Sequence, residues 1–313
     1  MKSRRATLRE IVISDGVTRV PIVHDVLSAK LADTVGFDAI SLSGHGVCLS
    51  ALGLPDSGYL TMPEIVEVSR NVAHAVDVPV YTDVDTGFGN AINARRTAEE
   101  VIRNTECAGF HIEDQVDPKR CGQMAGKQVI SRRELHGKMR AVCDVRDDID
   151  ETFVIIGRTD VLGVTDAGVE EAIVRGNEML DAGADIVFVD GIDSVERVRT
   201  IGEAIDGPLL YNKSGPNRSL SPAVDEETLS ELGYSLVAYH ASMTPMIQAV
   251  HEYMSELNER GMDHVVDFEE EMEELPVGDF YAFEGMKNVV ELEKQYLPDE
   301  EMRKYHNSDG KKL

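Results

Sequence analysis

The sequence predicts an α/β protein, a (β/α)8 TIM-type barrel with a C-terminal helical extension. Short apolar runs alternate along the chain with amphipathic helical segments, a pattern typical of parallel strands covered by helices. Eight such pairs occur within about 250 residues, the usual size of this barrel. The alternative, an open doubly wound sheet, would need a glycine-rich turn after its first strand. The turn here is Val23-His-Asp-Val26, so the barrel is favoured.

The predicted elements follow from these apolar runs and from the cap residues between them. Ser131 is suited to cap a helix, and Pro63 occupies an early helical position where its missing N–H costs nothing. The predicted strands are 20–24, 38–43, 78–83, 109–113, 152–157, 185–189, 208–211 and 234–239. The helices that follow them are 26–35, 63–76, 93–106, 131–143, 167–182, 194–205, 225–232 and 244–257.

We therefore expect a barrel catalytic domain over residues 1–260 and a helical tail over residues 261–313. The tail is acidic, and residues 286–296 are expected to form one further helix. Aromatic residues precede it, so the tail is interpreted as an oligomer contact; a frayed terminus is the alternative. The aromatic residues concerned are Phe280, Tyr281 and Phe283.

The composition is that of an acidic chain of 313 residues, with 31 lysines and arginines against 57 aspartates and glutamates. The net charge of −26 argues against nucleic acid and anionic membranes as partners, and indicates a halophilic, high-salt cytoplasm. We expect no secretory signal and no transmembrane helix, since no run of about 18 apolar residues occurs. The four scattered cysteines fit a cytoplasmic location and have no zinc-ligand spacing.

Polar side chains are concentrated where the predicted strands end. In a barrel of this kind, functional groups gather at the C-terminal ends of the strands. Six of the eight predicted ends carry polar or charged residues, more than random placement would leave there. These ends supply Ser43, Gly44 and His45 after the second strand, then Asp83, Asp85, Glu113, Arg158, Asp190 and Asn212.

Asp83 and Asp85 are candidate metal ligands. Residues two apart on a strand share one face, so we expect both carboxylates to point the same way, near Glu113. A hard divalent cation would compensate their repulsion; Mg²⁺ takes oxygen ligands and keeps several waters, and Mn²⁺ is possible. The alternative is an ordinary exposed strand end.

Cys121 is a candidate acid because it lies in the loop Lys119-Arg-Cys-Gly122. Positive neighbours lower the pKa of a thiol, so we expect a reactive cysteine; an incidental cysteine in a solvated loop is the alternative. The Ser43-Gly-His-Gly46 turn offers backbone N–H groups to a carboxylate, or is an ordinary turn. Arg158 suits a bidentate carboxylate contact, or an ion pair with Asp160.

Together these groups fit cleavage of a carbon–carbon bond in a hydroxy acid. The metal and Arg158 would hold an α-keto or α-hydroxy acid and stabilise the enolate that forms. The Cys121 thiol would protonate the carbanion left on the other fragment. The loop that carries Cys121 would close over the substrate and exclude water.

The sequence resembles the isocitrate lyase and phosphoenolpyruvate mutase superfamily from about Leu27 to Leu257. The Lys-Arg-Cys-Gly loop resembles the lyase branch, and length and motifs are most similar to the 2-methylisocitrate lyases. The motifs that carry the resemblance are Leu42-Ser-Gly44, Leu52-Gly-Leu-Pro-Asp56, Asp83-Val-Asp-Thr-Gly-Phe-Gly89, His111-Ile-Glu-Asp-Gln115, Pro118-Lys-Arg-Cys-Gly122 and Arg158-Thr-Asp160.

The resemblance implies Mg²⁺-dependent retro-aldol cleavage that releases pyruvate or glyoxylate plus a dicarboxylate, and a homotetramer that exchanges C-terminal helices. It implies that Asp85 binds Mg²⁺ directly, with Asp56, Asp83 and Glu113 acting through water. Cys121 would be the general acid, with Arg158 and Glu113 as further catalytic residues. The implied substrate-binding residues are Ser43, Gly44, His45, Arg120, Gly122, Gln123, Asp190 and Asn212.

Several positions depart from the family pattern. Ser41 stands where the lyases have Tyr, and Gln123 where they have His after Cys-Gly. Asp190 replaces a Glu, and Lys213 in the segment 212–217 stands in place of a Glu-containing sequence. His45 and Tyr81 are candidate proton carriers in place of the missing Tyr. The alternatives are an oxaloacetate-type decarboxylase or hydrolase, a phosphonate-related mutase, and a barrel that binds a carboxylate without turnover.

Overall fold

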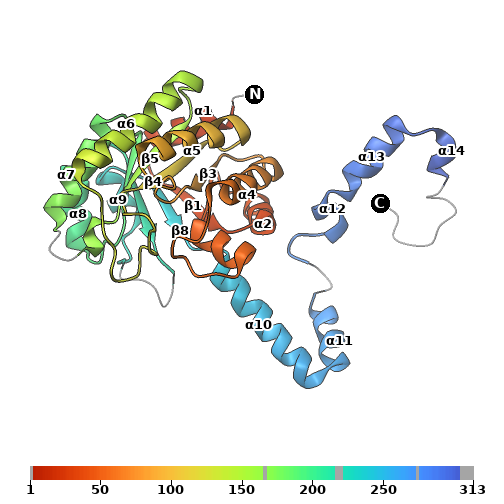
Figure 1. Ribbon diagram of the computed structural model, residues 1–313. Helices are drawn as coiled ribbons and strands as arrows, with labels where there is room; N and C mark the ends of the chain where they lie inside the picture. The colour runs from red at the N-terminus through yellow and green to blue at the C-terminus, as the bar shows by residue number, and fades with distance from the viewer. Residues whose placement is uncertain (1–2, 165–167, 216–220, 273–274, 304–313) are drawn as a thin grey trace. The chain divides into compact units, whose positions relative to one another are not determined.

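The computed structural model describes residues 3–164, 168–215, 221–272 and 275–303. Eight parallel strands close into a barrel, with β1 paired to both β2 and β8, so the predicted (β/α)8 fold is confirmed (Figure 1). The strands are β1 (Thr18–Val23), β2 (Ile40–Leu42), β3 (Val80–Asp83), β4 (Gly109–Glu113), β5 (Val154–Thr159), β6 (Ile186–Val189), β7 (Leu209–Lys213) and β8 (Tyr234–Tyr239).

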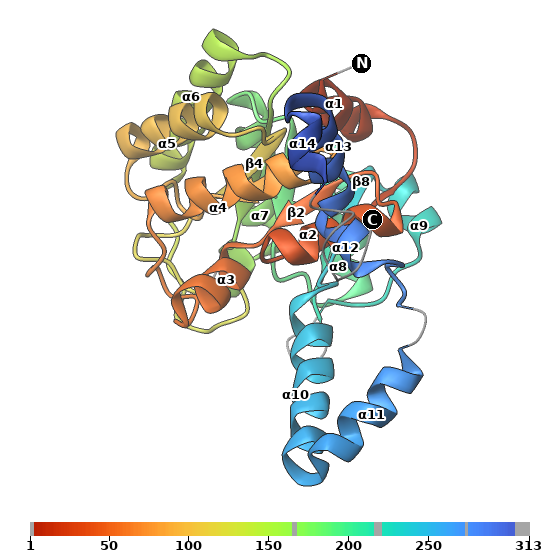
Figure 2. The ribbon, with the colours of Figure 1, turned by 90° about the vertical axis from the view of Figure 1, so that its right-hand side faces the viewer.

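A helix follows each strand, and α4, α5 and α6 lie side by side on one flank of the barrel (Figure 2). Capping boxes at Thr61 and Ser131 fix where α4 and α6 begin. The helices are α2 (Val26–Val35), α4 (Met62–Ala75), α5 (Ala91–Asn104), α6 (Arg132–Ile149), α7 (Val169–Asp181), α8 (Val195–Ala204), α9 (Glu226–Glu231) and α10 (Met243–Arg260).

One predicted helix boundary differs from the structure, and another lies outside the described residues. The predicted end of α6 at residue 143 is wrong, because the helix continues to Ile149 and buries Val145 and Arg146. The predicted start of α7 at Ala167 lies outside the described residues, and the described helix begins at Val169.

A helix that the sequence does not suggest, α1 (Arg4–Ile13), precedes the barrel. It is rich in arginine and reads as a polar segment, yet Leu8 and Val12 are buried with barrel residues such as Val154. The Arg5 guanidinium donates to the backbone carbonyls of residues 102, 105 and 107. Helix α1 is therefore part of the barrel core, and it leaves the opposite end of the strands for the site.

The chain divides into two compact units, Met1–Ile247 and Gln248–Leu313. The division falls inside α10, earlier than the predicted boundary after residue 260. The second unit contains α11 (Met262–Glu271), α12 (Phe280–Glu284), α13 (Met286–Tyr296) and α14 (Asp299–Met302). Helix α13 matches the helix predicted over 286–296, while residues 304–313 of the predicted tail lie outside the described residues.

Within this unit, the part of α10 from residue 248 onward forms a hairpin with α11 (Figure 2). The chain turns at Gly261, whose φ of +60° favours glycine, and Tyr253 packs against His264 and Phe268 with ring centroids 4.8 and 4.6 Å apart. Among the described residues, no helix combines the length and apolar composition needed to cross a bilayer.

Candidate active site

A cavity opens at the C-terminal ends of the strands, with about 700 Å³ of space that includes open solvent at its mouth. Three predicted site residues, Gly44, Asp85 and Glu113, are buried beside its lining. Arg120 is exposed and the structure does not bring it into the lining. Ten predicted site residues do line the cavity: Ser43, His45, Asp56, Asp83, Cys121, Gly122, Gln123, Arg158, Asp190 and Asn212.

The short helix α3 (Gly44–Val47) places His45 at the cavity. Its N-cap is Ser43, whose hydroxyl accepts a hydrogen bond from the Gly46 N–H at 3.1 Å. The Gly44 N–H donates to Asp83 Oδ2 at 3.2 Å. The turn that was predicted to hold a substrate carboxylate therefore already binds one carboxylate of the protein.

The expectation that Asp83 and Asp85 share one face of a strand is wrong. Strand β3 ends at Asp83, and Asp85 has a left-handed backbone with φ of +48°. The two carboxylates nonetheless approach one point, because a Cβ on Gly44 would lie 2.9 Å from Asp83 Oδ2 and 3.3 Å from Asp85 Oδ1. Glycine at 44 therefore makes room for this pair.

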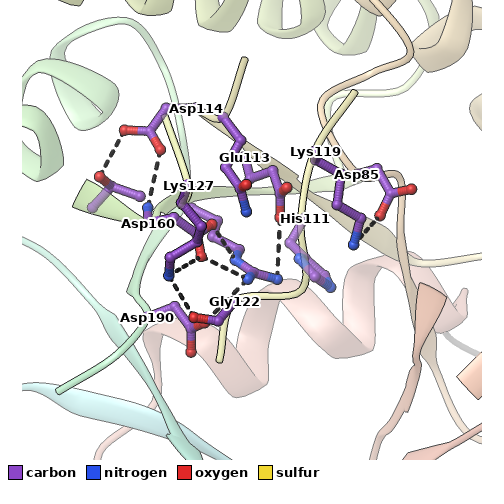
Figure 3. Close-up of polar contacts among 12 residues, drawn as sticks. Asp85, His111, Glu113, Asp114, Lys119, Gly122, Lys127, Asp160 and Asp190 are labelled. Atoms are coloured by element: carbon purple, nitrogen blue, oxygen red, sulfur yellow. Dashed lines mark hydrogen bonds and ion pairs between the residues drawn. The ribbon is translucent and has the colours of Figure 1, made fainter. Parts of the chain in front are cut away.

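Lys119 is buried within the acid cluster, and the sequence reading did not place it in the site. Its Nζ lies 2.7 Å from Asp56 Oδ1. It also lies 2.8 Å from Asp85 Oδ1 (Figure 3). Burial raises the pKa of Asp85 to about 7, although Lys119 opposes the change. Burial would also raise the pKa of Asp83, but His111, Lys119 and Arg158 outweigh it and lower that pKa to about 2.

Glu113 completes the cluster at the end of β4. Burial raises the pKa of Glu113 well above its usual range, although Arg158 opposes the change. Both Glu113 oxygens and Asp85 Oδ1 are buried without a hydrogen-bond partner, apart from their ion pairs with Arg158 and Lys119. Buried carboxylate oxygens of this kind are the ligands that Mg²⁺ prefers. The residues present therefore fit a divalent metal ion.

Arg158 projects from β5 into a group of three acids. Its guanidinium contacts Glu113 at 3.2 Å, Asp160 at 2.9 and 3.0 Å, and Asp190 at 3.1 Å, and it stacks over Phe188 at 5.1 Å. Both sequence interpretations of Arg158 are therefore compatible with the structure: it lines the cavity and is paired with Asp160. An incoming carboxylate would compete with these acids for the guanidinium.

Lys127 connects the loop that carries Cys121 to the acids that surround Arg158. The sequence did not predict this contact. The buried ammonium donates to the Gly122 carbonyl and to Asp160 Oδ1, the latter at 3.1 Å (Figure 3). Gly163 leaves room for it, because a Cβ there would lie 2.2 Å from Lys127 Cε. A Cβ on Gly122 would lie 2.0 Å from Asp190 Oδ2, so the loop packs closely against the barrel.

Cys121 is held at the cavity by its own backbone. Its N–H donates to the Asp56 carbonyl at 3.1 Å, and its Sγ lies 3.6 Å from His45 Nδ1. The expectation of a lowered thiol pKa is wrong. Burial raises the pKa of Cys121, and the neighbouring cation Lys119 is already paired with two carboxylates. A thiol in this environment keeps its proton at neutral pH, which suits an acid better than a nucleophile.

Tyr81 lies opposite Ser41 in the β2–β3 register and lines the cavity. Burial raises the pKa of Tyr81, outweighing a hydrogen bond with Ser41. Its neighbour His111 packs edge-on against it, and burial lowers the pKa of His111. The phenol of Tyr81 therefore keeps its proton and can donate a hydrogen bond. It lies beside Ser41, the position where the similar lyases are expected to have a tyrosine.

A sequence profile of the phosphoenolpyruvate phosphomutase family matches residues 8–258. The chain belongs to that family. It lies within the superfamily of phosphoenolpyruvate mutases and isocitrate lyases, as the motifs predict. The match covers the whole barrel, including every residue of the site described above.

Three similar proteins illustrate the range of the superfamily. The chain is 35% identical to the 2,3-dimethylmalate lyase of Eubacterium barkeri, over 93% of this chain and 97% of that one. It is 32% identical to the 2-methylisocitrate lyase of Halalkalibacterium halodurans, over 90% and 92%. Its structure resembles that of an oxaloacetate acetylhydrolase bound to 3,3-difluorooxaloacetate, with a TM-score of 0.82, 29% identity and coverage of 94% and 97%. The protein is an enzyme of the carbon–carbon lyase type.

Proposed function

We propose that the protein is a Mg²⁺-dependent lyase that cleaves a 2-hydroxy tricarboxylate into a 2-oxo acid and a dicarboxylate, or a 2-hydroxy dicarboxylate into a 2-oxo acid and a monocarboxylate. 2-Methylisocitrate is the first candidate substrate. The observation that carries the proposal is a single cavity lined by a protonated thiol, Cys121, and by Asp83 of the buried carboxylate cluster. A proton donor beside a metal-type acid cluster is what retro-aldol cleavage requires.

Asp85 is proposed to hold Mg²⁺ directly, with Asp56, Asp83 and Glu113 contributing through water; Mn²⁺ can replace it. When bound, the ion would hold oxygens of the 2-oxo acid and stabilise the negative charge that develops there. These acids would therefore fix where the acid end of the substrate binds.

Other side chains around the cavity would bind and orient the substrate. Arg158 orients a substrate carboxylate while Asp160 and Asp190 hold its guanidinium in place. Ser43, Gly44 and His45 are proposed to contact the carboxylate of the 2-oxo acid, and Gly122, Gln123 and Asn212 the rest of the substrate. Arg120 is exposed, so a contact from it requires the loop to move when substrate binds.

The cleavage moves two protons and breaks one carbon–carbon bond. The substrate hydroxyl gives up its proton and becomes the carbonyl of the 2-oxo acid, while the neighbouring carbon–carbon bond breaks. The electron pair of that bond goes to the carbon of the departing fragment, which takes a proton from the Cys121 thiol. His45 and Tyr81 are the candidates to carry the hydroxyl proton, because both line the cavity. Tyr81 keeps its own proton, so it would act only by passing that proton on as it accepts another.

A second candidate, hydrolysis or decarboxylation of an oxaloacetate-like keto acid, is favoured by two observations. Ser41 replaces the tyrosine that the lyases carry, and the fold is similar to that of an oxaloacetate acetylhydrolase. That chemistry needs the enolate-stabilising acids and Arg158 but no thiol donor. Cys121 argues against the third candidate, a phosphonate-related mutase.

We further propose a cytoplasmic homotetramer that exchanges C-terminal helices between neighbours. Every residue of α10 and α11, both described in full, is at least partly exposed. Apolar side chains on these and the following helices are left without cover in the single chain, as an exchanged helix would leave them. The exposed apolar residues are Ile247, Val250, Met254, Leu257, Met262, Val266, Phe268, Phe280, Tyr281, Met286, Val289, Leu292 and Tyr296.

The test is release of pyruvate or glyoxylate from methylisocitrate, isocitrate, dimethylmalate and oxaloacetate. Each is assayed with Mg²⁺ and with EDTA, in low and high KCl, for the native protein and for Cys121→Ser. Cleavage of one hydroxy acid that needs Mg²⁺ and is lost in the variant supports the lyase. Activity on oxaloacetate alone that survives Cys121→Ser supports the second candidate instead.

A further inference from the structure

Three side chains on the partly exposed side of the cavity bring different ligand atoms together. They are His45 from α3, Asp56 from the segment after the π-helical turn Cys48–Leu52, and Cys121 from the loop. One atom from each, a ring nitrogen, a carboxylate oxygen and the thiol sulfur, all lie within 4.8 Å of one another. Sequence spacing does not indicate this group, because its members come from three separate segments.

The distances within the group match those of a small tetrahedral cation. His45 Nδ1 lies 3.6 Å from Cys121 Sγ and 3.8 Å from Asp56 Oδ2. Zinc bonds of about 2.3 Å to sulfur and about 2.0–2.2 Å to nitrogen or oxygen place tetrahedral ligands about 3.6 Å apart for N and S and about 3.4 Å apart for N and O. The two distances from His45 therefore lie within a few tenths of an ångström of a zinc-type arrangement, and all three ligand atoms lie within 4.8 Å of one another.

The three groups are also fixed in place. The Cys121 N–H donates to the Asp56 carbonyl at 3.1 Å, which fixes two of the three residues relative to each other. The Ser43 cap fixes the start of α3, which carries His45. Lys119 holds Asp56 by its Oδ1 at 2.7 Å, which leaves Oδ2 directed toward His45. Little reorganisation is needed for all three to bind one ion.

We propose that His45, Asp56 and Cys121 form a site for Zn²⁺, or a cation of similar softness, distinct in chemistry from the all-carboxylate cluster. Imidazole and thiolate ligands select zinc-type cations, whereas Mg²⁺ prefers oxygen. Three protein ligands leave a fourth position for water. On binding, the Cys121 sulfur loses its proton to the buffer and forms the bond to zinc, because the thiolate is the ligand.

Zinc at this site would inhibit the enzyme reversibly. The inference of inhibition rests on the proposed function, since zinc occupies the thiol that is proposed to donate the proton. Zinc binding itself does not depend on that proposal. The decisive experiment therefore measures the thiol and not the catalytic rate.

The reaction of Cys121 with a thiol reagent measures occupancy directly. All four cysteines lie in the described part of the chain, and Cys48, Cys107 and Cys143 are buried, so the native protein reports mainly on Cys121. At zinc concentrations of about ten times the dissociation constant, the free thiol and its labelling rate should fall about tenfold. EDTA should restore the rate, and millimolar Mg²⁺ alone should leave it unchanged.

Two variants and a matched control locate the ion. His45→Gln should weaken protection by at least about 100-fold, because even changes beyond the ligands themselves cost about 10–100-fold in affinity. His240→Gln alters another histidine of the same cavity and should protect as the native protein does. Added Co²⁺ should give a thiolate-to-metal charge-transfer absorption in the native protein that Cys121→Ser lacks.

Two results would overturn the site. They are an unchanged labelling rate with zinc, and equal protection in His45→Gln and the native protein. The second would place zinc on ligands other than His45. Normal zinc protection in a protein that cleaves none of the four acids would retain this site and reject the proposed function.

Discussion

Replacing Lys127 with methionine should loosen the loop that carries Cys121. Methionine keeps the length and the apolar stem of the side chain but removes the ammonium group. The Gly122 carbonyl then loses its donor, and Asp160 loses one of its two cationic partners. The fold should survive, because Asp160 keeps both contacts to Arg158 at 2.9 and 3.0 Å.

The magnitude follows from the burial of the pair, whose side chains are 1% and 0% exposed. Removing one partner of a buried ion pair costs about 3–5 kcal/mol, and the remaining Arg158 contacts favour the lower end, about 3 kcal/mol. For a unit of this size, that lowers Tm by about 6–12 °C. The matched control is Lys294→Met, whose exposed pair with Glu291 at 2.8 Å contributes about 0–1 kcal/mol.

The stability effect of Lys127→Met should depend on pH, because Lys127 is paired with the ionisable side chain of Asp160. Burial would raise the pKa of Asp160, but Arg158 and Lys127 lower it below the ordinary value of 3.8. The stability from this lowered pKa is fully present above pH 3.8 and is lost as the pH falls through the folded value. Lys127→Met removes one cause of the lowered Asp160 pKa. The difference in Tm between the variant and the native protein should therefore become smaller in acid.

Calorimetry at several pH values and Cys121 labelling test the reasoning together. We expect a lower Tm and faster labelling in Lys127→Met, and neither change in Lys294→Met. If both variants lose the same small amount of stability and Cys121 reacts at the native rate, Lys127 does not hold the loop.

Three further predictions concern charge and protons. Mg²⁺ should raise the Tm of Lys119→Met more than that of the native protein, because Asp56 and Asp85 then lack their internal cation; equal shifts would contradict the metal assignment. Alkylation of Cys121 should have a pH midpoint above that of a free cysteine peptide, since burial raises the pKa of this thiol; a lower midpoint would show an activated thiolate. Finally, Tm should rise from low to molar KCl because salt screens the net charge of −26, and an unchanged Tm would argue against halophilic adaptation.

The barrel could be predicted because its signal is repeated and local. Each strand is an apolar run with a helix behind it, and the register brings their polar ends to one side of the sheet. Predicted strand 109–113 and helix 26–35 match β4 and α2 at both ends. Helix α1 was missed because its arginines read as solvated, although Arg5 donates to backbone carbonyls.

The burial and ion pairing of each side chain were harder to predict than its position at the end of a strand. A lysine beside a cysteine suggests an activated thiol, yet the Lys119 ammonium lies between Asp56 and Asp85 and burial dominates at Cys121. Alternation along a strand suggested a shared face for Asp83 and Asp85, yet the left-handed backbone at Asp85 breaks that alternation. Ion pairs across loops and positive φ angles depend on tertiary contacts, which local patterns do not contain.

Three buried cations balance part of the negative charge of the acids at the end of the barrel. The side chains at the end of the barrel include three cations, Lys119, Lys127 and Arg158, that are each paired with at least one acid. The acids paired with them are Asp56, Asp85, Glu113, Asp160 and Asp190. The pKa of Asp85 and of Glu113 is raised by burial, so the protein alone does not fully stabilise their charges. A divalent cation would supply the missing positive charge where these two raised values occur, and the cations that remain would then be available to a carboxylate substrate.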